Sequence, residues 1–364
     1  DDLMKCWSRR SGLVAVHNTR RKEVDTMTML RTLTWGFLAT GALTLAACSE
    51  QTVVPSATDT GGKLLAAKGA GGKPGGGGDP GSGTPADPAI AYSTGSGCTS
   101  RGEAGLRVVD AEGSNNFDIT CEVVWDPSWS PDGKSIVFYD LALNQMFVVD
   151  VALDAQGHPI TQNPRLLGLE EGSSPAWSPQ GGVIAYQYFD SQTLYTVPAI
   201  GGPSTTVCMG CGMDPTWSPD GSRLAFVTMG GGLKTVTVST GAIQTLIPDG
   251  AFEFVGQPDW SRSGDRIAFM AKLLDGGPRG TYVLDLGTGI HSLVTDLGWP
   301  ASWSPDDKEL VMFNRAKPWN LGVLRVVNSV TGATVRVMAE IRGSKSVGLD
   351  WRRCAPGPGC GPGN

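Results

Sequence analysis

One short motif recurs along the chain and constrains its fold more than any other feature. A tryptophan is followed by a serine and a tight-turn sequence, as in Trp129-Ser130-Pro131-Asp132-Gly133, and then by a short apolar run. Successive tryptophans are 48, 40, 43, 43 and 48 residues apart. They are Trp129, Trp177, Trp217, Trp260, Trp303 and Trp351. Units of about 40–45 residues with four strands are typical of β-propeller blades, whereas solenoid turns need about 20–30 residues.

Each unit is interpreted as a meander of four antiparallel strands. The tryptophan ends the first strand, and proline and glycine set the backbone angles of the turn that follows it. A second strand of the Ile-Ala-Phe kind returns, and a third ends near an aspartate, as in residues 146–150. A fourth strand follows, for example over residues 243–247. The 51 glycines and 24 prolines suit this turn-rich, all-β interpretation, because both residues break helix interiors.

The two ends of the repeat region complete one another. Residues 90–92, 106–110 and 117–120 match a second, third and fourth strand, but no tryptophan strand precedes them. The strand that ends at Trp351 is not followed by a second, third or fourth strand. The sequence therefore predicts a six-bladed propeller whose first blade is closed by the C-terminal strand. Such closure removes exposed sheet edges. The repeated tryptophans are expected to pack between blades.

These motifs resemble the repeat of TolB-type β-propellers, which are related to WD-repeat-like propellers. The resemblance covers residues 88–353 and rests on five clear copies of the motif. It implies a six-bladed ring and favours a binding scaffold, although the fold hosts enzymes as well.

Topology assigns the loops of such a ring to two faces. The Pro-Asp-Gly turns and the third-to-fourth-strand turns share one face, and the second-to-third-strand loops and blade-to-blade loops share the other. On this second face, acidic residues precede the repeated tryptophans near the central channel, and three further tryptophans break the repeat. The predicted partner-binding residues are Asp126, Asp214, Asp259, Asp350, Trp125, Trp299 and Trp319. An acidic mouth with aromatics suits a cationic peptide, a partner protein or a metal ion; the alternative is a solvated rim of loops.

Six cysteines after residue 48 are predicted to form three disulfides, as expected of an exported protein. The blade assignment brings Cys98 to the same face as Cys121, and it leaves Cys208 with Cys211 in one loop and Cys354 with Cys360 in the tail. A redox or zinc role for Cys208 and Cys211 is the alternative. It lacks a second Cys-x-x-Cys motif and a nearby histidine.

Motifs for catalysis are sparse. No Gly-x-Ser-x-Gly elbow and no phosphate-binding glycine motif occurs, and only His158 and His291 follow residue 47. We therefore expect a non-catalytic scaffold without metal or cofactor. A carbohydrate-active lyase or hydrolase that uses the channel mouth is the alternative. The net charge of −6 argues against a nucleic-acid partner.

The N-terminal region is interpreted as an export signal. Residues 1–26 are assigned to an over-extended start, and residues 27–47 to a signal peptide whose apolar run ends in Leu45-Ala46-Ala47-Cys48. This ending resembles the lipobox of bacterial lipoproteins, which implies a lipid on Cys48; Ser49 then favours the outer membrane.

Residues 48–87 form a glycine- and proline-rich, disordered tether, since eleven of the 23 residues from 61 to 83 are glycine. Residues 354–364 form a Cys/Gly/Pro tail. The sequence thus predicts a monomeric cell-envelope lipoprotein, facing the periplasm or the cell surface, that binds an envelope protein or cell-wall material.

Overall fold

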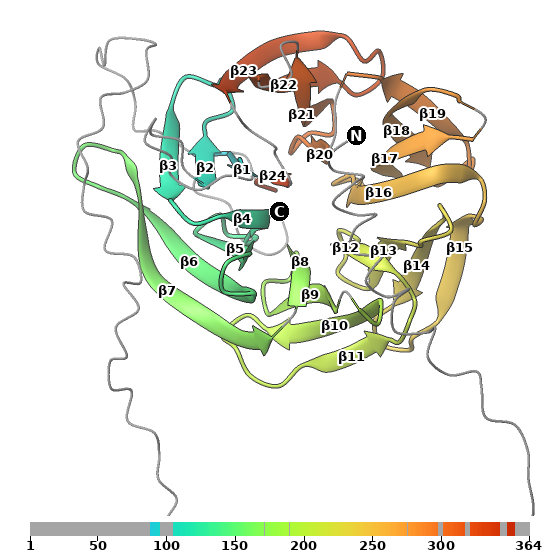
Figure 1. The fold of residues 1–364 in the computed structure, drawn as a ribbon, viewed down its shortest axis with the longest axis horizontal. Coiled ribbons are helices and arrows are strands. Elements are labelled where there is room, and N and C mark those ends of the chain that lie inside the picture. Colours follow the sequence, from blue (N-terminus) through green and yellow to red (C-terminus); the bar gives the residue numbers. More distant parts are fainter. Residues whose placement is uncertain are drawn as a thin grey trace, which may run out of the picture. The chain divides into compact units, whose positions relative to one another are not determined.

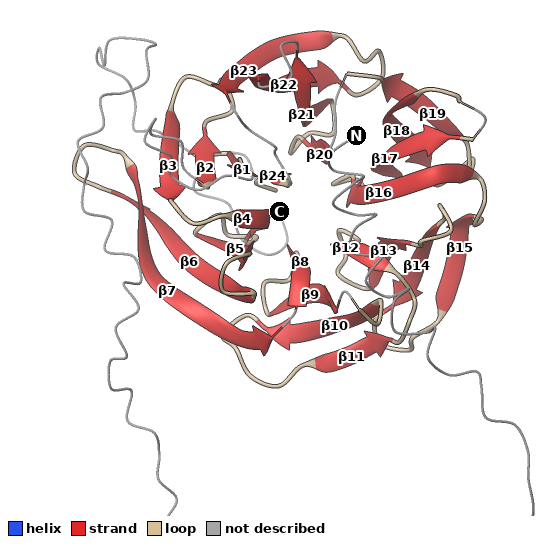
Figure 2. Cartoon of the chain, viewed as in Figure 1, coloured by secondary structure: helices blue, strands red, loops and turns tan. Residues whose placement is uncertain are grey.

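The computed structural model describes residues 88–94, 105–170, 172–188, 190–274, 276–297, 301–316, 321–342 and 348–353. These residues form 24 β-strands, grouped into six sheets of four strands (Figures 1 and 2). Within this described part, no helix is long and apolar enough to cross a membrane. The all-β, six-bladed propeller predicted from the repeat is confirmed.

The sheets are arranged around a centre as blades, and Figure 1 shows one strand of each sheet nearest to it. The innermost strands are β24 (Leu349–Trp351), β4 (Val124–Trp129), β8 (Gly172–Trp177), β12 (Met213–Trp217), β16 (Phe252–Trp260) and β20 (Ala301–Trp303). The second strands are β1 (Ile90–Ser93), β5 (Ser135–Asp140), β9 (Val183–Tyr188), β13 (Arg223–Val227), β17 (Arg266–Leu273) and β21 (Glu309–Ala316).

The outer half of each blade is completed by two further antiparallel strands. The third strands are β2 (Leu106–Val109), β6 (Gln145–Leu153), β10 (Thr193–Pro198), β14 (Leu233–Thr237), β18 (Arg279–Asp285) and β22 (Leu321–Asn328). The outermost strands are β3 (Asn116–Thr120), β7 (Pro159–Glu170), β11 (Thr205–Cys208), β15 (Ile243–Ile247), β19 (His291–Thr295) and β23 (Thr334–Arg342). We number the blades one to six, beginning with the sheet β24-β1-β2-β3.

Blade one is closed by the strand from the far end of the chain, as predicted. β24 pairs antiparallel with β1, and Trp351 lies opposite Ile90. The backbone N–H of Arg352 donates to the carbonyl of Ala89 at 2.7 Å and continues the pairing. The ring is thereby closed by main-chain hydrogen bonds rather than by side-chain contacts alone.

The core consists of six apolar clusters, one at each interface between neighbouring blades. Each cluster contains one repeated tryptophan. Trp129 of blade two, for example, packs with Leu106 and Val108 of blade one. Trp260 and Trp303 are fully buried. The prediction that these tryptophans pack between blades is confirmed.

Serine and aspartate side chains stabilise the tight turns that follow the tryptophans. Ser130 donates to the carboxylate of Asp132 at 2.6 Å, and the N–H of Lys134 donates to the same carboxylate oxygen at 3.1 Å. Gly133 has φ of 66°, a left-handed conformation that favours glycine. These turns mark where each innermost strand ends and the second strand of the blade begins.

Candidate functional site

The four predicted aspartates line one central cavity of about 100 Å³. Its walls are residues of the six innermost strands, mostly at the three positions before each repeated tryptophan, together with Gly348 before β24 and Arg353 after it. We number positions relative to the repeated tryptophan. Asp126 and Asp214 then occupy position −3, whereas Asp259 and Asp350 occupy position −1.

Position −3 has an unusual backbone in four consecutive blades. Asp126, Ser174, Asp214 and Gln257 have φ angles of 48°, 49°, 53° and 45°. The pairing register with the second strand shifts at each of these sites, as in a β-bulge. A proline follows each of them, at position −2, and it has no N–H to donate to the sheet. The bulge places the four side chains at the cavity.

Asp126 and Asp214 are joined through one serine hydroxyl. The Ser174 Oγ lies 3.1 Å from Asp126 Oδ2 and 3.3 Å from Asp214 Oδ1. The second carboxylate oxygen of Asp214 accepts the N–H of Gln257 at 3.1 Å. These contacts connect blades two, three, four and five.

Burial raises the pKa of both carboxyls in this group. The negative charge of Asp214 raises the pKa of Asp126 further, to about 7, and hydrogen bonds from Ser174 and Gln257 oppose the shift only partly. Carboxyls with strongly raised pKa values cluster at functional sites, although structural networks also contain them.

The side chains at position −1 connect each blade to the next. Asp259 accepts the backbone N–H of Trp303 at 2.8 Å and the hydroxyl of Ser302 at 2.9 Å. Asp350 accepts the N–H of Trp129 at 2.7 Å. Ser302 in turn accepts the N–H of Trp351 at 3.1 Å. Asp259 and Asp350 therefore hold the ring together as well as lining the cavity.

Two arginines lie beside the acidic pair Asp259 and Asp350. The Arg262 guanidinium donates to the carbonyls of Trp303 and Trp351 at 3.1 and 2.9 Å. Burial raises the pKa of Asp350 to about 6, while the charges of Arg262 and Arg353 lower it. Burial and Arg262 lower the pKa of Arg353 to about 10. This side of the cavity is close to charge balance, in contrast to the side with Asp126 and Asp214.

Of the three predicted tryptophans, only Trp125 is among the described residues. Trp125 lies within β4 rather than in a loop, where its ring contacts Tyr139 with centroids 6.4 Å apart, and it does not line the cavity. Trp299 and Trp319 lie outside the described residues. Their role in binding remains a prediction.

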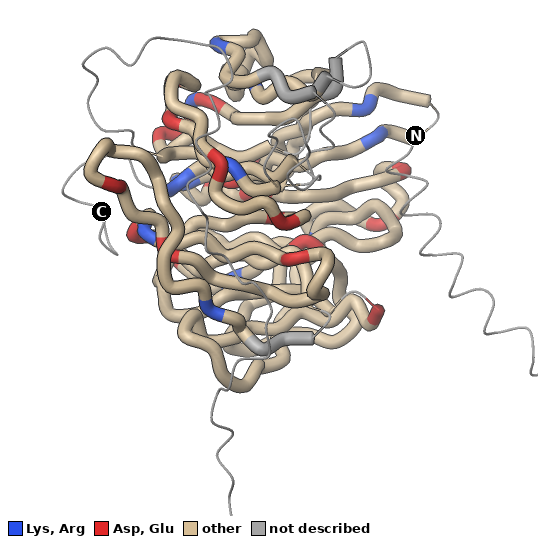
Figure 3. The backbone as a smooth tube through the Cα atoms, turned by 60° about the vertical axis from the view of Figure 1, so that its left-hand side comes forward, with Lys and Arg blue, Asp and Glu red and all other residues tan. Residues whose placement is uncertain are grey.

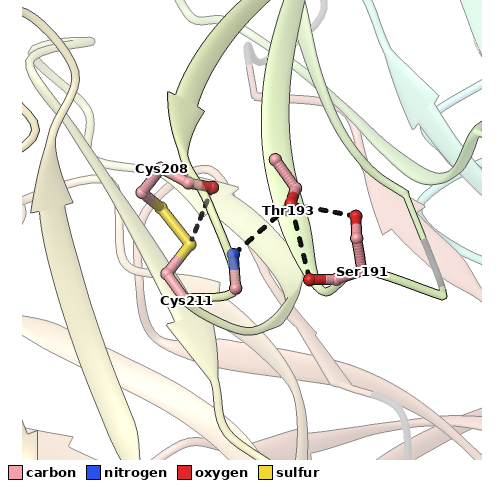
Figure 4. Close-up of a disulfide and its surroundings, with 5 residues drawn as sticks. Ser191, Thr193, Cys208 and Cys211 are labelled. Atoms are coloured by element: carbon pink, nitrogen blue, oxygen red, sulfur yellow. Dashed lines mark hydrogen bonds between the residues drawn. A yellow bond between two sulfur atoms is a disulfide. The ribbon is translucent and has the colours of Figure 1, made fainter. Parts of the chain in front are cut away.

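The loop between blades three and four is closed by a disulfide between Cys208 and Cys211 (Figure 4). The N–H of Gly210 within it donates to Thr193 Oγ1 at 3.3 Å. Cys121 is disulfide-bonded as well. The other predicted cysteines, Cys48, Cys98, Cys354 and Cys360, lie outside the described residues.

Residues important to the cavity were missed in the sequence because only acidic ones were selected there. Ser174 and Gln257 occupy the same repeat position as Asp126 and Asp214. Arg262 and Arg353 stand two residues after their tryptophans, where the other four copies have proline. An alignment of the six copies of the repeat, position by position, reveals these four residues.

The described residues offer no metal centre: no group of three or more His, Cys, Asp or Glu side chains is placed to hold an ion there. His158 lies at the tip of the β6–β7 hairpin against Phe117, and His291 packs on Phe252. Neither histidine lines the cavity.

The face that carries the blade-to-blade loops, which we call the mouth face, presents exposed apolar side chains. Met209, in the disulfide loop, is 83% exposed, and Met229 is 58% exposed. The Gln192 side chain of blade three contacts the Met229 sulfur at 3.0 Å. In Figure 3 the acidic and basic residues of the described chain are interspersed, without an extended basic run.

Comparisons with known proteins agree on the fold. The family described as "TolB beta propeller domain" matches residues 87–346. No curated protein matches the chain. TolB from Acinetobacter baumannii is similar in structure, with a TM-score of 0.61 and 17% identity over 74% of this chain and 67% of that chain. A putative TolB from Agrobacterium tumefaciens has a TM-score of 0.51 and 18% identity, over 71% of this chain and 90% of that chain. A chain of a nidogen/laminin complex has a TM-score of 0.55 and 8% identity, over 73% of this chain and 98% of that chain.

Proposed function

The chain belongs to the TolB beta-propeller family, and on this premise we propose that it is a non-catalytic scaffold that docks an envelope protein on its mouth face. Cell-wall material is the other partner predicted from the sequence. One observation carries the proposal: an acidic cavity opens among the innermost strands of a ring whose mouth face also presents exposed methionines. Flexible, polarizable methionines are frequent at surfaces that bind protein partners.

The chemistry of the cavity favours a positively charged group of the partner. Four carboxyls and a single arginine, Arg353, line it. Complementary charges of this kind steer association and set register more than they add affinity. A cavity of about 100 Å³ accepts a single side-chain end group, whereas small-molecule pockets are typically about 300–1,000 Å³. The size of the cavity thus supports the scaffold over the carbohydrate-active alternative.

The predicted export signal adds a membrane anchor to the proposal. A lipid on Cys48 would anchor the chain to the outer membrane, and the residues up to 87 would act as the tether of the propeller. We propose a monomer, and the partner is then a different protein rather than a second copy. The acidic character of the chain, with a net charge of −6, argues against nucleic acid as the partner.

Photo-cross-linking from matched positions tests the docking face. A photoreactive amino acid replaces Met209 on the mouth face or Ile200 on the opposite face, in cells that make the full chain. Both positions flank β11 of the same blade, and their side chains are 83% and 90% exposed. We expect a discrete cross-linked protein from position 209 and none from position 200. Equal cross-linking from both positions, or from position 200 alone, would refute the proposed docking face.

A further inference from the structure

We propose that Asp126 and Asp214 share one proton through the hydroxyl of Ser174, and that this proton sets the charge of the channel mouth. The three residues come from β4, β8 and β12, which are neighbours around the centre of the ring (Figure 1). The shared proton is a property of the isolated protein. Its consequence for docking rests on the proposed function.

The hydrogen-bond geometry favours a proton on one carboxyl. The Ser174 hydroxyl has one hydrogen and donates it to one acceptor. Its oxygen nevertheless lies within hydrogen-bond distance of both Asp126 Oδ2 and Asp214 Oδ1. Both contacts are hydrogen bonds only if one carboxyl is protonated and donates to the serine oxygen, which then donates to the other carboxylate.

The backbone around the pair restricts where the two carboxyls can lie. Asp126, Ser174 and Asp214 all have left-handed backbone angles fixed by their bulges. Asp126 is also confined on its far side, because a Cβ on Gly348 would lie 2.6 Å from the Asp126 Cα. Two like charges held close together in a half-buried site favour uptake of a proton, which agrees with the raised pKa of both groups.

No described cation compensates the pair. The pKa of Asp126 and Asp214 responds to burial, to the Asp214 charge and to hydrogen bonds from Ser174 and Gln257. The other charged groups of the cavity are Asp259 of β16, Asp350 of β24 and Arg353. The elements packed around the pair carry further titratable or charged side chains, namely Tyr92 of β1, Tyr139 and Asp140 of β5, Asp150 of β6, Tyr186 and Tyr188 of β9, Tyr195 of β10, Arg223 of β13, Glu253 of β16, and Arg262 after β16. Glu253 is paired with Lys272 at 2.6 Å, and Asp150 with Arg165 at 3.0 Å.

These surrounding groups are engaged elsewhere. Asp140 accepts the backbone N–H groups of its own turn, and Arg223 lies over the Trp260 ring at 5.0 Å. Arg262 donates to backbone carbonyls across the channel. Ser174 of β8 and Ser302 of β20 are neutral. The pair therefore carries one negative charge when it holds the proton and two after release, so alkaline conditions strengthen its attraction for a cationic group.

Infrared difference spectra of the isolated protein at increasing pH test the shared proton. A protonated carboxyl has its own carbonyl band, which disappears on ionisation. We expect a band that is lost near neutral pH in the wild type and is absent in both D126N and D214N. The double variant should lose no more than either single variant, because one proton is shared. Two independent acids would instead lose separate bands in separate variants, and that result would overturn the proposal.

Matched variants isolate the signal. D350N removes another half-buried carboxyl with a raised pKa. D220N removes a turn carboxyl whose pKa is lowered by hydrogen bonds from Ser218 and Ser222. Both variants should keep the band assigned to the pair. If an asparagine variant of the pair does not fold, the wild type and D350N decide: a band above pH 5 that D350N keeps supports the shared proton, and the absence of any protonated carboxyl above pH 5 refutes it.

A second measurement separates this inference from the proposed function. Cross-linking yield from position 209 is compared at pH 6 and pH 8.5 in wild type and D126N. We expect a severalfold higher yield at pH 8.5 in wild type and no such rise in D126N. A titrating band combined with a pH-independent yield leaves the shared proton in place and removes its role in docking.

Discussion

Aspartate occupies three positions of the repeat, and each gives the carboxyl a different environment. In the turns, Asp220 and Asp306 accept hydrogen bonds from neighbouring serines, and the pKa of each is lowered. At position −1, Asp259 accepts the N–H of the next tryptophan. At position −3, Asp126 is half-buried beside a second carboxyl, and desolvation raises its pKa. Residue type alone therefore does not specify the role; the position in the repeat does.

Replacing Asp259 tests the connection between blades. Asp259 is only 9% exposed, and D259A leaves the Trp303 N–H and the Ser302 hydroxyl without this acceptor. Leaving a buried donor unpaired typically costs about 1–3 kcal/mol. We expect the free energy of unfolding, measured by urea denaturation, to fall by about that amount. The exposed-turn variant E112A should change it by less than about 0.5 kcal/mol. Equal effects of the two would contradict the structural role of Asp259.

The buried acids predict how stability depends on pH. The pKa of Asp126 is raised from 3.8 to about 7 and that of Asp350 to about 6, so the folded state binds more protons than the unfolded chain between these values. Stability should therefore be highest toward pH 4 and fall as the pH rises to about 7. A difference of one pKa unit between the folded and unfolded states corresponds to about 1.4 kcal/mol in the free energy of unfolding. We expect Tm from calorimetry to fall by several degrees from pH 5 to pH 7.5.

The matching variant is D126N, which replaces the titrating carboxyl by a neutral amide of similar shape. It should flatten the pH dependence of Tm and raise Tm at pH 7.5. The aspartates with lowered pKa, such as Asp150 and Asp265, act below about pH 4 and leave this window unaffected. A Tm that rises from pH 5 to pH 7.5 would contradict the assignment.

At the residue scale, the sequence predicted that acids gather before the tryptophans but not how they divide. The repeat alignment placed Asp126, Asp214, Asp259 and Asp350 near the channel, and all four line the cavity. The bulge at position −3 depends on a left-handed backbone at residues other than glycine, which composition and periodicity do not reveal. The Ser174 bridge is also a tertiary contact between three blades, so no local pattern encodes it.

At the scale of elements, β24 closes the ring across the largest sequence separation in the fold. It pairs with β1, and Arg262 from blade five donates to the carbonyl of Trp351. Trp351 also completes the apolar cluster between blades six and one. Without β24, β1 would present an unpaired edge, which favours aggregation.

Two truncations test this closure. Removing residues 348–364 deletes β24 and the tail, whereas removing residues 354–364 deletes the tail alone. We expect the shorter truncation to keep the Tm and the monomeric elution of the full propeller, and the longer one to lower Tm sharply or to aggregate during size-exclusion chromatography. Identical behaviour of the two truncations would contradict closure by β24.

Element order was predictable because each blade repeats one local pattern: a tryptophan strand, a tight turn and an apolar return strand. Departures from that pattern were not predictable. Asp307 stands where other copies have glycine, yet it has φ of 59°. Its carboxylate accepts the N–H groups of Arg262 and Ser263 at 2.7 Å, in the turn of the neighbouring blade. This contact compensates a backbone angle that disfavours aspartate, and only the assembled ring provides it.

At the scale of the whole molecule, the anchor and the docking face are separate predictions. The predicted N-terminal export signal determines how the protein is retained at the membrane, and the propeller determines which partner it binds. β1 begins at Ile90, shortly after the predicted tether ends at residue 87. The two functions should therefore be separable by substitution, since no residue of the cavity belongs to the export signal.

Substitutions at the lipobox test this separation. C48S removes the thiol to which the lipid would be attached, so the protein should leave the membrane fraction, measured by detergent phase partition. S49D keeps the thiol and should keep partition into detergent, but the resemblance to lipoprotein sorting implies retention in the inner membrane, measured by density-gradient separation of envelopes. Neither change should alter the Tm of the propeller, because both lie at the start of the predicted tether, outside the propeller. If C48S protein still partitions into detergent while its signal peptide is cleaved, the retention must come from the propeller or its partner, and the lipid anchor is refuted without affecting the docking face.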